Sequence, residues 1–338
     1  MTITSKLLSP FDFEAACQVR GLSVSYRVDG RELYALRGID LDIPQGEISA
    51  VIGESGSGKS TLALALMNAV SSPGKIAEGT VTYRDLGEIT RMSPEQLRRI
   101  RGKSISMVFQ ASQNSMNPLR RVGAQLLDLA RSHGMRDPRQ VLLEAGTLAR
   151  RMSLDPDRVL TSYQHQLSGG MRQRVGIIFA LVLKPEILLM DEPTTALDVL
   201  SQSSVLEIVR SIQRERQLTT VLITHDMGVV AELADRVIVL YAGRVVEEAS
   251  TGELLRHPRH PYTQALIRAI PRLTGDPKTA IALEGQPPAL ASIPMVGCVF
   301  RDRCPHRMAV CETQAPSLQT DEKIRHRFAC HWEGASND

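Results

Sequence analysis

The sequence has no long apolar run and no recognisable leader segment. The uncharged stretch at residues 175–183 is far shorter than the roughly 18 apolar residues that a membrane-spanning helix needs. Residues 1–10 contain one lysine and lack the apolar core of a secretory signal. We therefore expect a soluble, cytoplasmic protein that reaches a membrane only through a partner.

Neither sign of charge dominates. The 40 lysine and arginine residues nearly balance the 37 aspartate and glutamate residues, which leaves a net charge of +3. A nucleic-acid-binding protein usually carries a larger basic excess, so this balance argues against such a partner. Hydrophobic residues make up 43% of the 338 residues, enough for a substantial core, and the chain has no internal repeat. Its length indicates one large domain or two smaller ones.

Cysteine is too scarce for a disulfide scaffold, because the chain contains only five. Cys17 stands alone, whereas Cys298, Cys304, Cys311 and Cys330 fall close to the C-terminus. In a reducing compartment, such a group of thiols indicates a metal site or free thiols rather than bridges.

Short apolar segments alternate with helical ones along most of the chain. Apolar or alternating segments predict strands at residues 18–26, 36–43, 48–52, 187–190, 220–223 and 237–240. Helical spacing of apolar residues predicts helices at 61–70, 125–130, 141–152 and 172–183. This alternation predicts an α/β fold with a parallel sheet.

Two further segments interrupt this pattern. The polar, arginine-rich stretch at about 93–166 predicts a helical subdomain inserted between the strands. After Gly252, nine prolines break up any long regular element, so we place a boundary near Leu254. We expect one domain at 16–254 and a small irregular C-terminal module at 255–338, which holds the four clustered cysteines.

Residues 53–60 read Gly-Glu-Ser-Gly-Ser-Gly-Lys-Ser and fit the pattern G-x-x-x-x-G-K-[ST] between a predicted strand and a predicted helix. The glycines let backbone N–H groups turn toward phosphate oxygens, and the helix adds its positive end. The charge of Lys59 suits the β- and γ-phosphates, and the hydroxyl of Ser60 suits Mg²⁺. The predicted nucleotide-binding residues of this loop are Gly53, Ser55, Gly56, Ser57, Gly58, Lys59, Ser60 and Thr61.

Two carboxylates follow the apolar segment at residues 187–190. A buried strand that ends in Asp191 can present it to Mg²⁺ at the carboxyl edge of the sheet. Glu192, the next residue, can polarise an attacking water as a general base. An apolar segment followed by two acids is common and by itself indicates no function. The roles of the two carboxylates are better supported here, because a phosphate-binding loop precedes them.

The segment at residues 167–171, Leu-Ser-Gly-Gly-Met, resembles the LSGGQ signature of ATP-binding-cassette (ABC) ATPases. A serine and two glycines that open a helix make a second anion site. In ABC ATPases this site closes on the γ-phosphate bound by the other subunit. The resemblance therefore implies a dimer that sandwiches ATP, with the signature residues Ser168, Gly169, Gly170 and Met171 acting on the partner's site.

The other ABC elements follow in the family's order. Gln110 matches the Q-loop, residues 195–198 with Asp198 match the D-loop, and His225 matches the switch histidine that contacts the γ-phosphate. Tyr26 stands where the family keeps an aromatic ring that stacks on adenine. The resemblance implies catalytic roles for Lys59, Glu192 and His225, and a Mg²⁺ site formed by Ser60, Gln110 and Asp191.

Several segments resemble one particular family of ABC ATPase subunits. Met171 and the segment at residues 191–199 resemble the D-type ATPase subunits of the oligopeptide/dipeptide/nickel importer family. Residues 257–263 and 297–305 are similar to segments that this family carries after its nucleotide domain. The resemblance implies a peripheral subunit at the cytoplasmic face of the inner membrane. Its implied partners are an F-type ATPase subunit as a heterodimer, two transmembrane permeases and, through the complex, an extracellular solute-binding protein.

We therefore expect an ATP-hydrolysing subunit that drives uptake of a peptide-like solute, with oligosaccharide, opine or nickel uptake as alternatives. A soluble ABC ATPase acting on DNA or the ribosome is disfavoured by the single P-loop and by the short gap between Lys59 and Asp191. A regulatory module without hydrolysis is disfavoured because every hydrolytic position is present.

The four C-terminal cysteines have no C-x₂-C pair among them, which argues against a zinc ribbon. Four thiolates suit a [4Fe–4S] cluster without one fixed spacing, and some members of the resembled family carry such a cluster in this module. We expect Cys298, Cys304, Cys311 and Cys330 to ligate it. A mixed Cys/His zinc site with His306, His326 and His331 is the first alternative, and four unligated thiols are the second.

Overall fold

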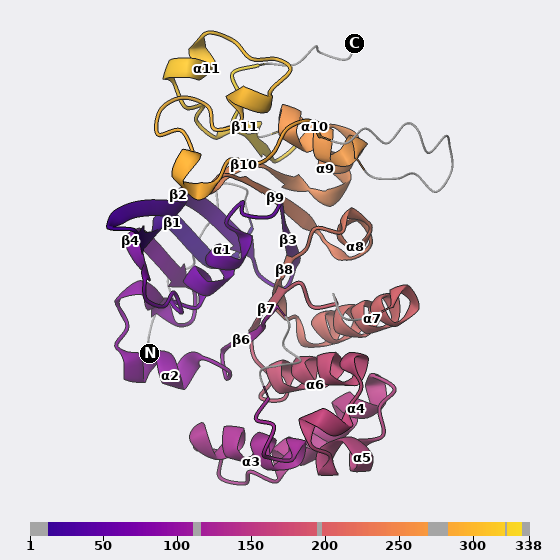
Figure 1. Ribbon diagram of the computed structural model, residues 1–338. Coiled ribbons are helices and arrows are strands. Elements are labelled where there is room, and N and C mark those ends of the chain that lie inside the picture. Colours follow the sequence, from indigo (N-terminus) through magenta and orange to yellow (C-terminus); the bar gives the residue numbers. More distant parts are fainter. Residues whose placement is uncertain (1–12, 111–115, 195–197, 270–282, 322, 333–338) are drawn as a thin grey trace. The chain divides into compact units, whose positions relative to one another are not determined.

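The computed structural model describes residues 13–110, 116–194, 198–269, 283–321 and 323–332 (Figure 1). The chain divides into two compact units, and each is described by itself. Unit 1 combines residues 1–90 with residues 223–338, and unit 2 comprises residues 91–222. A membrane-spanning helix is absent from the described part of the chain, since the helices there are too short or too polar for one.

An antiparallel sheet of four strands forms the N-terminal part of unit 1, in the order β2-β1-β4-β5. A tight turn joins its first two strands. Asp29 and Gly30 both have positive φ there, 48° and 76°, as two-residue turns between twisted antiparallel strands require. The strands are β1 (Ala15–Val28), β2 (Arg31–Pro44), β4 (Gly74–Tyr83) and β5 (Gly87–Glu88).

The second group of strands in unit 1 lies in the order β3-β9-β10-β12-β11. Strand β3 runs parallel to β9, whereas β9, β10, β12 and β11 are antiparallel to their neighbours. Every residue of β3 and β9 is buried, as expected for strands covered on both faces. These strands are β3 (Ile48–Ile52), β9 (Arg236–Tyr241), β10 (Arg244–Ser250), β11 (Gln319–Asp321) and β12 (His326–Phe328).

Five helices of unit 1 lie in its described part, and two of them, α10 and α11, belong to the C-terminal module. The C-terminal module packs on β9 and β10 through a shared hydrophobic core that includes Tyr241, Tyr262 and Phe300. The helices are α1 (Lys59–Leu66), α8 (Met227–Leu233), α9 (Thr251–Arg256), α10 (Pro261–Arg268) and α11 (Val310–Thr313), with short 3-10 helices at η1 (Ile89–Arg91), η5 (Leu290–Ser292) and η6 (Arg301–Arg303).

Unit 2 contains the neighbouring strands β6 (Ile105–Val108), β7 (Ile187–Asp191) and β8 (Thr219–Ile223), the last of which ends at the unit boundary. Strands β6 and β7 are parallel. Its helices are amphipathic, and the buried face of α3, for example, carries Val122, Leu126 and Ala130. They are α2 (Pro94–Ile100), α3 (Val122–Ser132), α4 (Gln140–Arg151), α5 (Pro156–Thr161), α6 (Gly169–Leu181) and α7 (Val199–Arg216), with the 3-10 helix η3 (Gln164–Gln166).

The predicted α/β fold is confirmed, but the prediction of a parallel sheet holds only for some strand pairs. Strands β1, β2, β4 and β10 pair antiparallel with their neighbours. Tight turns connect β1 to β2 and β9 to β10, and such turns join antiparallel strands. Strand β6 lies inside the stretch predicted to be helical. The boundaries at 16–254, 93–166 and 255–338 stay predictions.

Candidate active site

The phosphate-binding loop at residues 53–60 joins the end of β3 to the start of α1, the arrangement that its pattern requires. Gly53, Gly56 and Gly58 have positive φ values of 151°, 79° and 106°. A Cβ on Gly53 would lie 2.2 Å from the carbonyl oxygen of Leu240, and one on Gly58 would lie 2.9 Å from that of Ala35. Glycine is therefore required at both positions by conformation and by space.

The side chain of Lys59 closes this loop on itself. Its ammonium group donates hydrogen bonds to the carbonyl oxygens of Gly53 at 2.7 Å and Glu54 at 2.9 Å. The hydroxyl of Ser57 is buried, without a hydrogen-bond partner among the described residues. Buried polar atoms of folded proteins are nearly always satisfied, so this hydroxyl fits a site where a bound phosphate oxygen completes the bonding. The loop and the N-terminus of α1 thus form a cradle that suits an anion.

Unit 1 also brings His225 to the loop. Gly53, Glu54 and His225 line one cavity of about 330 Å³, together with the start of α8. The Thr224 backbone N–H donates to the Val51 carbonyl at 3.4 Å, which holds the segment before His225 against β3. The structure therefore places the predicted switch histidine beside the predicted phosphate site.

Tyr26 lies near the end of β1 and is partly exposed. Its ring packs close to Gly74, since a Cβ on that glycine would come within 2.6 Å of the Tyr26 ring. A partly exposed aromatic ring is able to stack on a base, and the proposed contact with adenine stays a prediction.

In unit 2, the predicted carboxylates stand at the end of β7. Asp191 is the last residue of the strand and is 3% exposed. Glu192 follows with a φ of 49°, a left-handed conformation that is unusual for a residue with a side chain. Such conformations cluster at functional sites, because the surrounding structure must impose them.

Gln173, which belongs to none of the predicted site residues, supports the segment after Glu192. This side chain is fully buried in α6, and its amide nitrogen donates to the carbonyl oxygen of Pro193. The contact ties the helix that begins with the signature motif to the chain directly after the predicted base. No local signal distinguishes this residue, because Gln173 stands between Arg172 and Arg174.

The signature motif opens α6. Ser168 is the N-cap, and its hydroxyl accepts a hydrogen bond from the Met171 backbone N–H at 3.3 Å. Ser168 is exposed, and Gly169 and Gly170 are partly exposed. The start of this helix is therefore open to an anion from outside the unit.

Two other predicted residues of unit 2 lie at element ends. Gln110 is exposed after β6. Asp198 is the N-cap of α7, and its carboxylate accepts from the Ser201 backbone N–H at 3.0 Å. The D-loop residues at 195–197 lie outside the described residues.

The predicted [4Fe–4S] cluster is wrong. Among the residues that the structure describes, no group of three or more Cys, His, Asp or Glu side chains is able to hold a metal ion. Cys298 and Cys311 are buried in the hydrophobic core of unit 1, against which Cys304 packs. Burial raises the pKa of Cys298 and Cys304, and it raises that of Cys330 to about 11.

The alternative zinc site is not supported either. The ring nitrogen Nε2 of His326 lies 2.6 Å from the Glu247 carboxylate, and that of His331 lies 3.0 Å from the Gln314 carbonyl oxygen. The ring of His306 stacks on Trp332. Cys298, Cys304 and Cys311 act as small apolar residues in the packing of unit 1.

Comparison with known proteins agrees with this geometry. The family "ABC transporter" matches residues 36–195, and the family "Oligopeptide/dipeptide transporter, C-terminal region" matches residues 246–311. The chain is 39% identical over 319 residues to the dipeptide transport ATP-binding protein DppD of Bacillus subtilis (strain 168), covering 94% of each chain. It is 41% identical over 293 residues to the oligopeptide transport ATP-binding protein AppD of the same organism, covering 86% of this chain and 89% of AppD.

Solved structures show the same relationship. The dimeric post-hydrolysis structure of the ATP-binding cassette MJ0796, bound to ADP and phosphate, is 29% identical with a TM-score of 0.62. The match covers 70% of this chain and 98% of that cassette.

The fold and the phosphate-binding loop define an ABC ATPase. More narrowly, the chain belongs to the ATP-binding proteins of the oligopeptide/dipeptide ABC transporter family, as its D-type motifs indicated. It binds and hydrolyses ATP, and its place is that of a peripheral subunit at the cytoplasmic face of the membrane. The predicted heterodimer with an F-type subunit is wrong, because the names of DppD and AppD mention no such partner and the solved cassette is itself dimeric.

Proposed function

We propose that this chain powers a membrane importer for a peptide-like solute by binding and hydrolysing ATP. The observation that carries this proposal is the glycine-built phosphate cradle at residues 53–60, with Lys59 across it. The names of the relatives, dipeptide and oligopeptide transport ATP-binding proteins, support peptides as the solute. The match of residues 246–311 to the C-terminal region of such transporters supports it further.

In the proposed ATP complex, the backbone N–H groups of the loop and the Ser57 hydroxyl hold the phosphates. Lys59 then exchanges its two carbonyl partners for the β- and γ-phosphate oxygens. Tyr26 stacks on the adenine ring from the partly exposed end of β1. His225 contacts the γ-phosphate, which its place beside Gly53 and Glu54 supports.

Ser60, Gln110 and Asp191 are the proposed Mg²⁺ ligands. They offer hydroxyl, amide and carboxylate oxygens, which are the hard donors that this ion prefers. Bound Mg²⁺ neutralises charge on the phosphates.

Glu192 is the proposed general base. It takes a proton from a water whose oxygen forms a bond to the γ-phosphorus, while the bond to the β,γ-bridging oxygen breaks and ADP leaves. The left-handed backbone of Glu192 and the Gln173 contact just beyond it support a fixed position for this carboxylate.

Turnover is proposed to require a second cassette. Ser168, Gly169, Gly170 and Met171 act on ATP held by the partner, which their position at the open start of α6 supports. Asp198 belongs to the proposed D-loop of the same interface.

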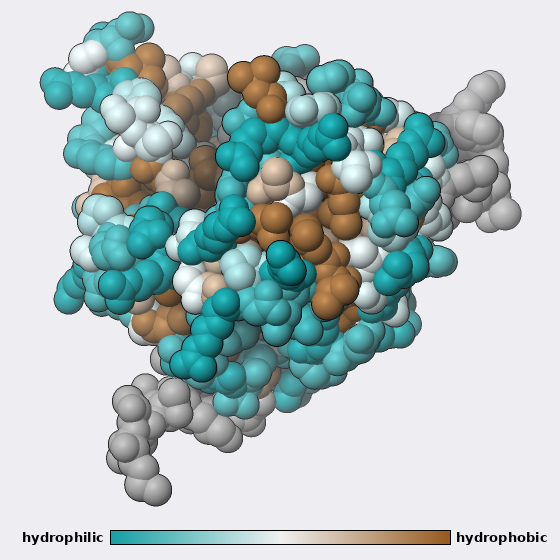
Figure 2. All heavy atoms as spheres, turned by 90° about the horizontal axis from the view of Figure 1, so that it is seen from below, coloured by the Kyte–Doolittle hydropathy of each residue, from teal (hydrophilic) through white to brown (hydrophobic). Residues whose placement is uncertain are grey.

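Unit 2 is the proposed receiver of the permease. Figure 2 shows hydrophobic atoms among hydrophilic ones on the face seen from below. In the chain around Gln110, Phe109 is 44% exposed and Leu119 is 84% exposed. Contact with a permease would remove the apolar surface of these two side chains from water, which is favourable. The complex is completed by two permeases and a solute-binding protein.

The test is peptide uptake by membrane vesicles that carry the complete complex with its permeases. We expect uptake only when ATP is present on the side of the membrane that carries the ATPase. We expect no uptake with Lys59→Ala, because this variant weakens ATP binding. Uptake of a nickel complex or an oligosaccharide, but of no peptide, would correct the solute. Uptake that persists with Lys59→Ala would overturn the role of the ATPase.

A further inference from the structure

The residue that follows the first glycine of the phosphate-binding loop, Glu54, is held by the C-terminal module. Its backbone N–H donates to the hydroxyl oxygen of Tyr262 at 2.8 Å. Its carboxylate accepts two hydrogen bonds from Arg303, at 2.6 and 3.0 Å, one to each oxygen. Such paired contacts of a guanidinium with a carboxylate are both strong and directional.

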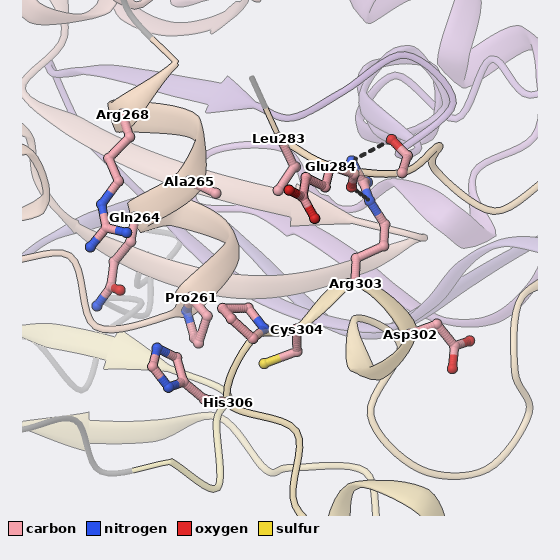
Figure 3. Close-up of a pocket in the computed structure, with 12 residues that line it drawn as sticks. Pro261, Gln264, Ala265, Arg268, Leu283, Glu284, Asp302, Arg303, Cys304 and His306 are labelled. Carbon is pink, nitrogen blue, oxygen red and sulfur yellow. Dashed lines mark hydrogen bonds between the residues drawn. The ribbon is translucent and has the colours of Figure 1, made fainter. Parts of the chain in front are cut away.

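The Arg303 side chain is fixed from several sides. It is 6% exposed and extends from η6 toward the Glu284 segment, as Figure 3 shows. There it donates to the carbonyl oxygens of Glu284 at 2.9 Å and Gly285 at 3.2 Å (Figure 3). It also contacts the Tyr241 hydroxyl at 3.4 Å. The guanidinium is therefore held in place independently of Glu54.

Tyr262 is equally rigid. Its ring is fully buried and packs against Tyr241 and Phe300, with centroids 4.6 and 5.4 Å away. The hydroxyl that accepts from Glu54 thus stands on a packed aromatic cluster rather than on a mobile side chain.

The remaining polar group of Glu54 connects these contacts to catalysis. Its carbonyl oxygen accepts from the Lys59 ammonium group at 2.9 Å. The N–H, the carboxylate and the carbonyl of one residue therefore link Tyr262, Arg303 and Lys59. A displacement of Glu54 displaces the loop carbonyls that orient Lys59.

We propose that Arg303 and Tyr262 are positioning residues, which fix the phosphate-binding loop through Glu54 and so make nucleotide affinity depend on the C-terminal module. The proposal rests on the proposed role of Lys59 at the phosphates. It gives the module a function in the ATP cycle that neither family match assigns to it.

The test uses the full chain, with variants Arg303→Gln, Tyr262→Phe and Glu54→Gln. ATP binding is measured with a fluorescent nucleotide in the isolated chain, and kcat and KM are measured in the assembled complex. The matched control is Arg307→Gln, because Arg307 pairs with Glu312 and Asp302 in the same module and, among the described residues, forms no hydrogen bond or ion pair with the loop. The midpoint of thermal unfolding is measured for every variant, to check that each one is folded.

We expect each of the three variants to weaken ATP binding by about fivefold or more at a temperature where all are folded. KM should rise more than kcat falls, and Arg307→Gln should change neither by more than about twofold. Arg303→Lys keeps the charge but loses the paired geometry, so it should restore only part of the affinity.

A double variant separates positioning from general destabilisation. If Arg303 acts through Glu54, then Arg303→Gln combined with Glu54→Gln should weaken ATP binding no more than the stronger single variant. Additive losses would overturn this route, as would unchanged ATP affinity in a folded Glu54→Gln. If Arg303→Gln fails to fold, Glu54→Gln and Tyr262→Phe still decide the question, since both leave the Arg303 contacts with residues 284 and 285 in place. Failure of Lys59→Ala to weaken ATP binding would instead refute the underlying role of Lys59.

Discussion

Alanine substitutions at two loop glycines should separate conformational strain from steric exclusion. Gly53 and Gly56 both have positive φ, so alanine is strained at each, at a cost of about 1–2 kcal/mol. At Gly56 the new Cβ would meet nothing within 4 Å. At Gly53 it would lie 2.2 Å from the Leu240 carbonyl oxygen and 2.7 Å from the Ser57 hydroxyl.

The Leu240 oxygen belongs to the backbone of β9, a buried strand paired with both β3 and β10, so it cannot move alone. We therefore expect Gly53→Ala to cost about 3 kcal/mol more than Gly56→Ala, the upper range of overpacking penalties. For a unit of this size, that difference corresponds to a thermal midpoint lower by about 6–12 °C.

The assay is thermal unfolding of the full chain without nucleotide, followed by far-UV circular dichroism and by calorimetry. Nucleotide is omitted because a bound ligand stabilises the folded chain by an amount that depends on its affinity for each variant. Gly21→Ala, which has a φ of 57° and an open Cβ site outside the loop, reports strain alone. Equal destabilisation by Gly53→Ala and Gly56→Ala would refute the steric reasoning.

Three other predictions concern catalysis and stability. Glu192→Gln should retain ATP binding and lower turnover by at least about a hundredfold, and substantial steady-state hydrolysis by this variant in the assembled complex would exclude Glu192 as the base. Gln173→Met should lower stability by only about 1 kcal/mol yet reduce kcat severalfold, since it frees the Pro193 carbonyl near that base; an unchanged kcat would show that the contact is structural. Burial lowers the pKa of His260 from 6.5 to about 4, so folding requires a neutral ring, and stability present above pH 6.5 is lost as the pH falls toward 4. Between pH 7.5 and pH 5 the wild type should lose about 2 kcal/mol more than His260→Gln in urea unfolding, and parallel losses would contradict this.

Local composition was sufficient to predict the elements that carry the phosphate site. Strand β3 occupies residues 48–52 as predicted, because a short apolar run stands between two glycines. The helix after the loop begins at Lys59 rather than at residue 61, since its first residues are polar and the helical period starts only later. It ends at Leu66, close to Asn68, whose φ of 49° is left-handed.

Strand pairing was much harder to predict, because it depends on contacts between distant segments. Strand β4 contains two glycines and several polar residues, and its exposed positions give no strand signal. Strand β6 has only four residues and lies in an arginine-rich stretch. Strand β12 is added to β10 across 79 residues, where buried His326 meets buried Glu247. No local pattern contains that information.

The cysteines show where residue chemistry alone is insufficient. Four thiols near the C-terminus are compatible with ligation and with packing, and the choice depends on their surroundings. In the structure, Cys298 and Cys311 lie in a core with Phe300 and Tyr262, and burial raises the pKa of Cys298. The sequence placed the thiols in one module but could not predict that aromatic rings would surround them.

The contact between Glu54 and Arg303 is the least predictable feature of the site and the most informative one. The two residues are separated by 249 positions, and the loop pattern treats the position of Glu54 as variable. A carboxylate beside a phosphate site is unfavourable for an anionic ligand unless its charge is balanced. The paired Arg303 supplies that balance, and Tyr262 occupies the N–H of the same residue. Replacing Glu54 by a neutral residue therefore leaves an uncompensated buried guanidinium, whereas replacing Arg303 leaves an uncompensated carboxylate close to the nucleotide. The ATP affinities of the two variants should therefore depend differently on salt concentration. If the affinity of Arg303→Gln recovers at high salt and that of the Glu54 variant does not, the charge that the nucleotide meets is the Glu54 carboxylate.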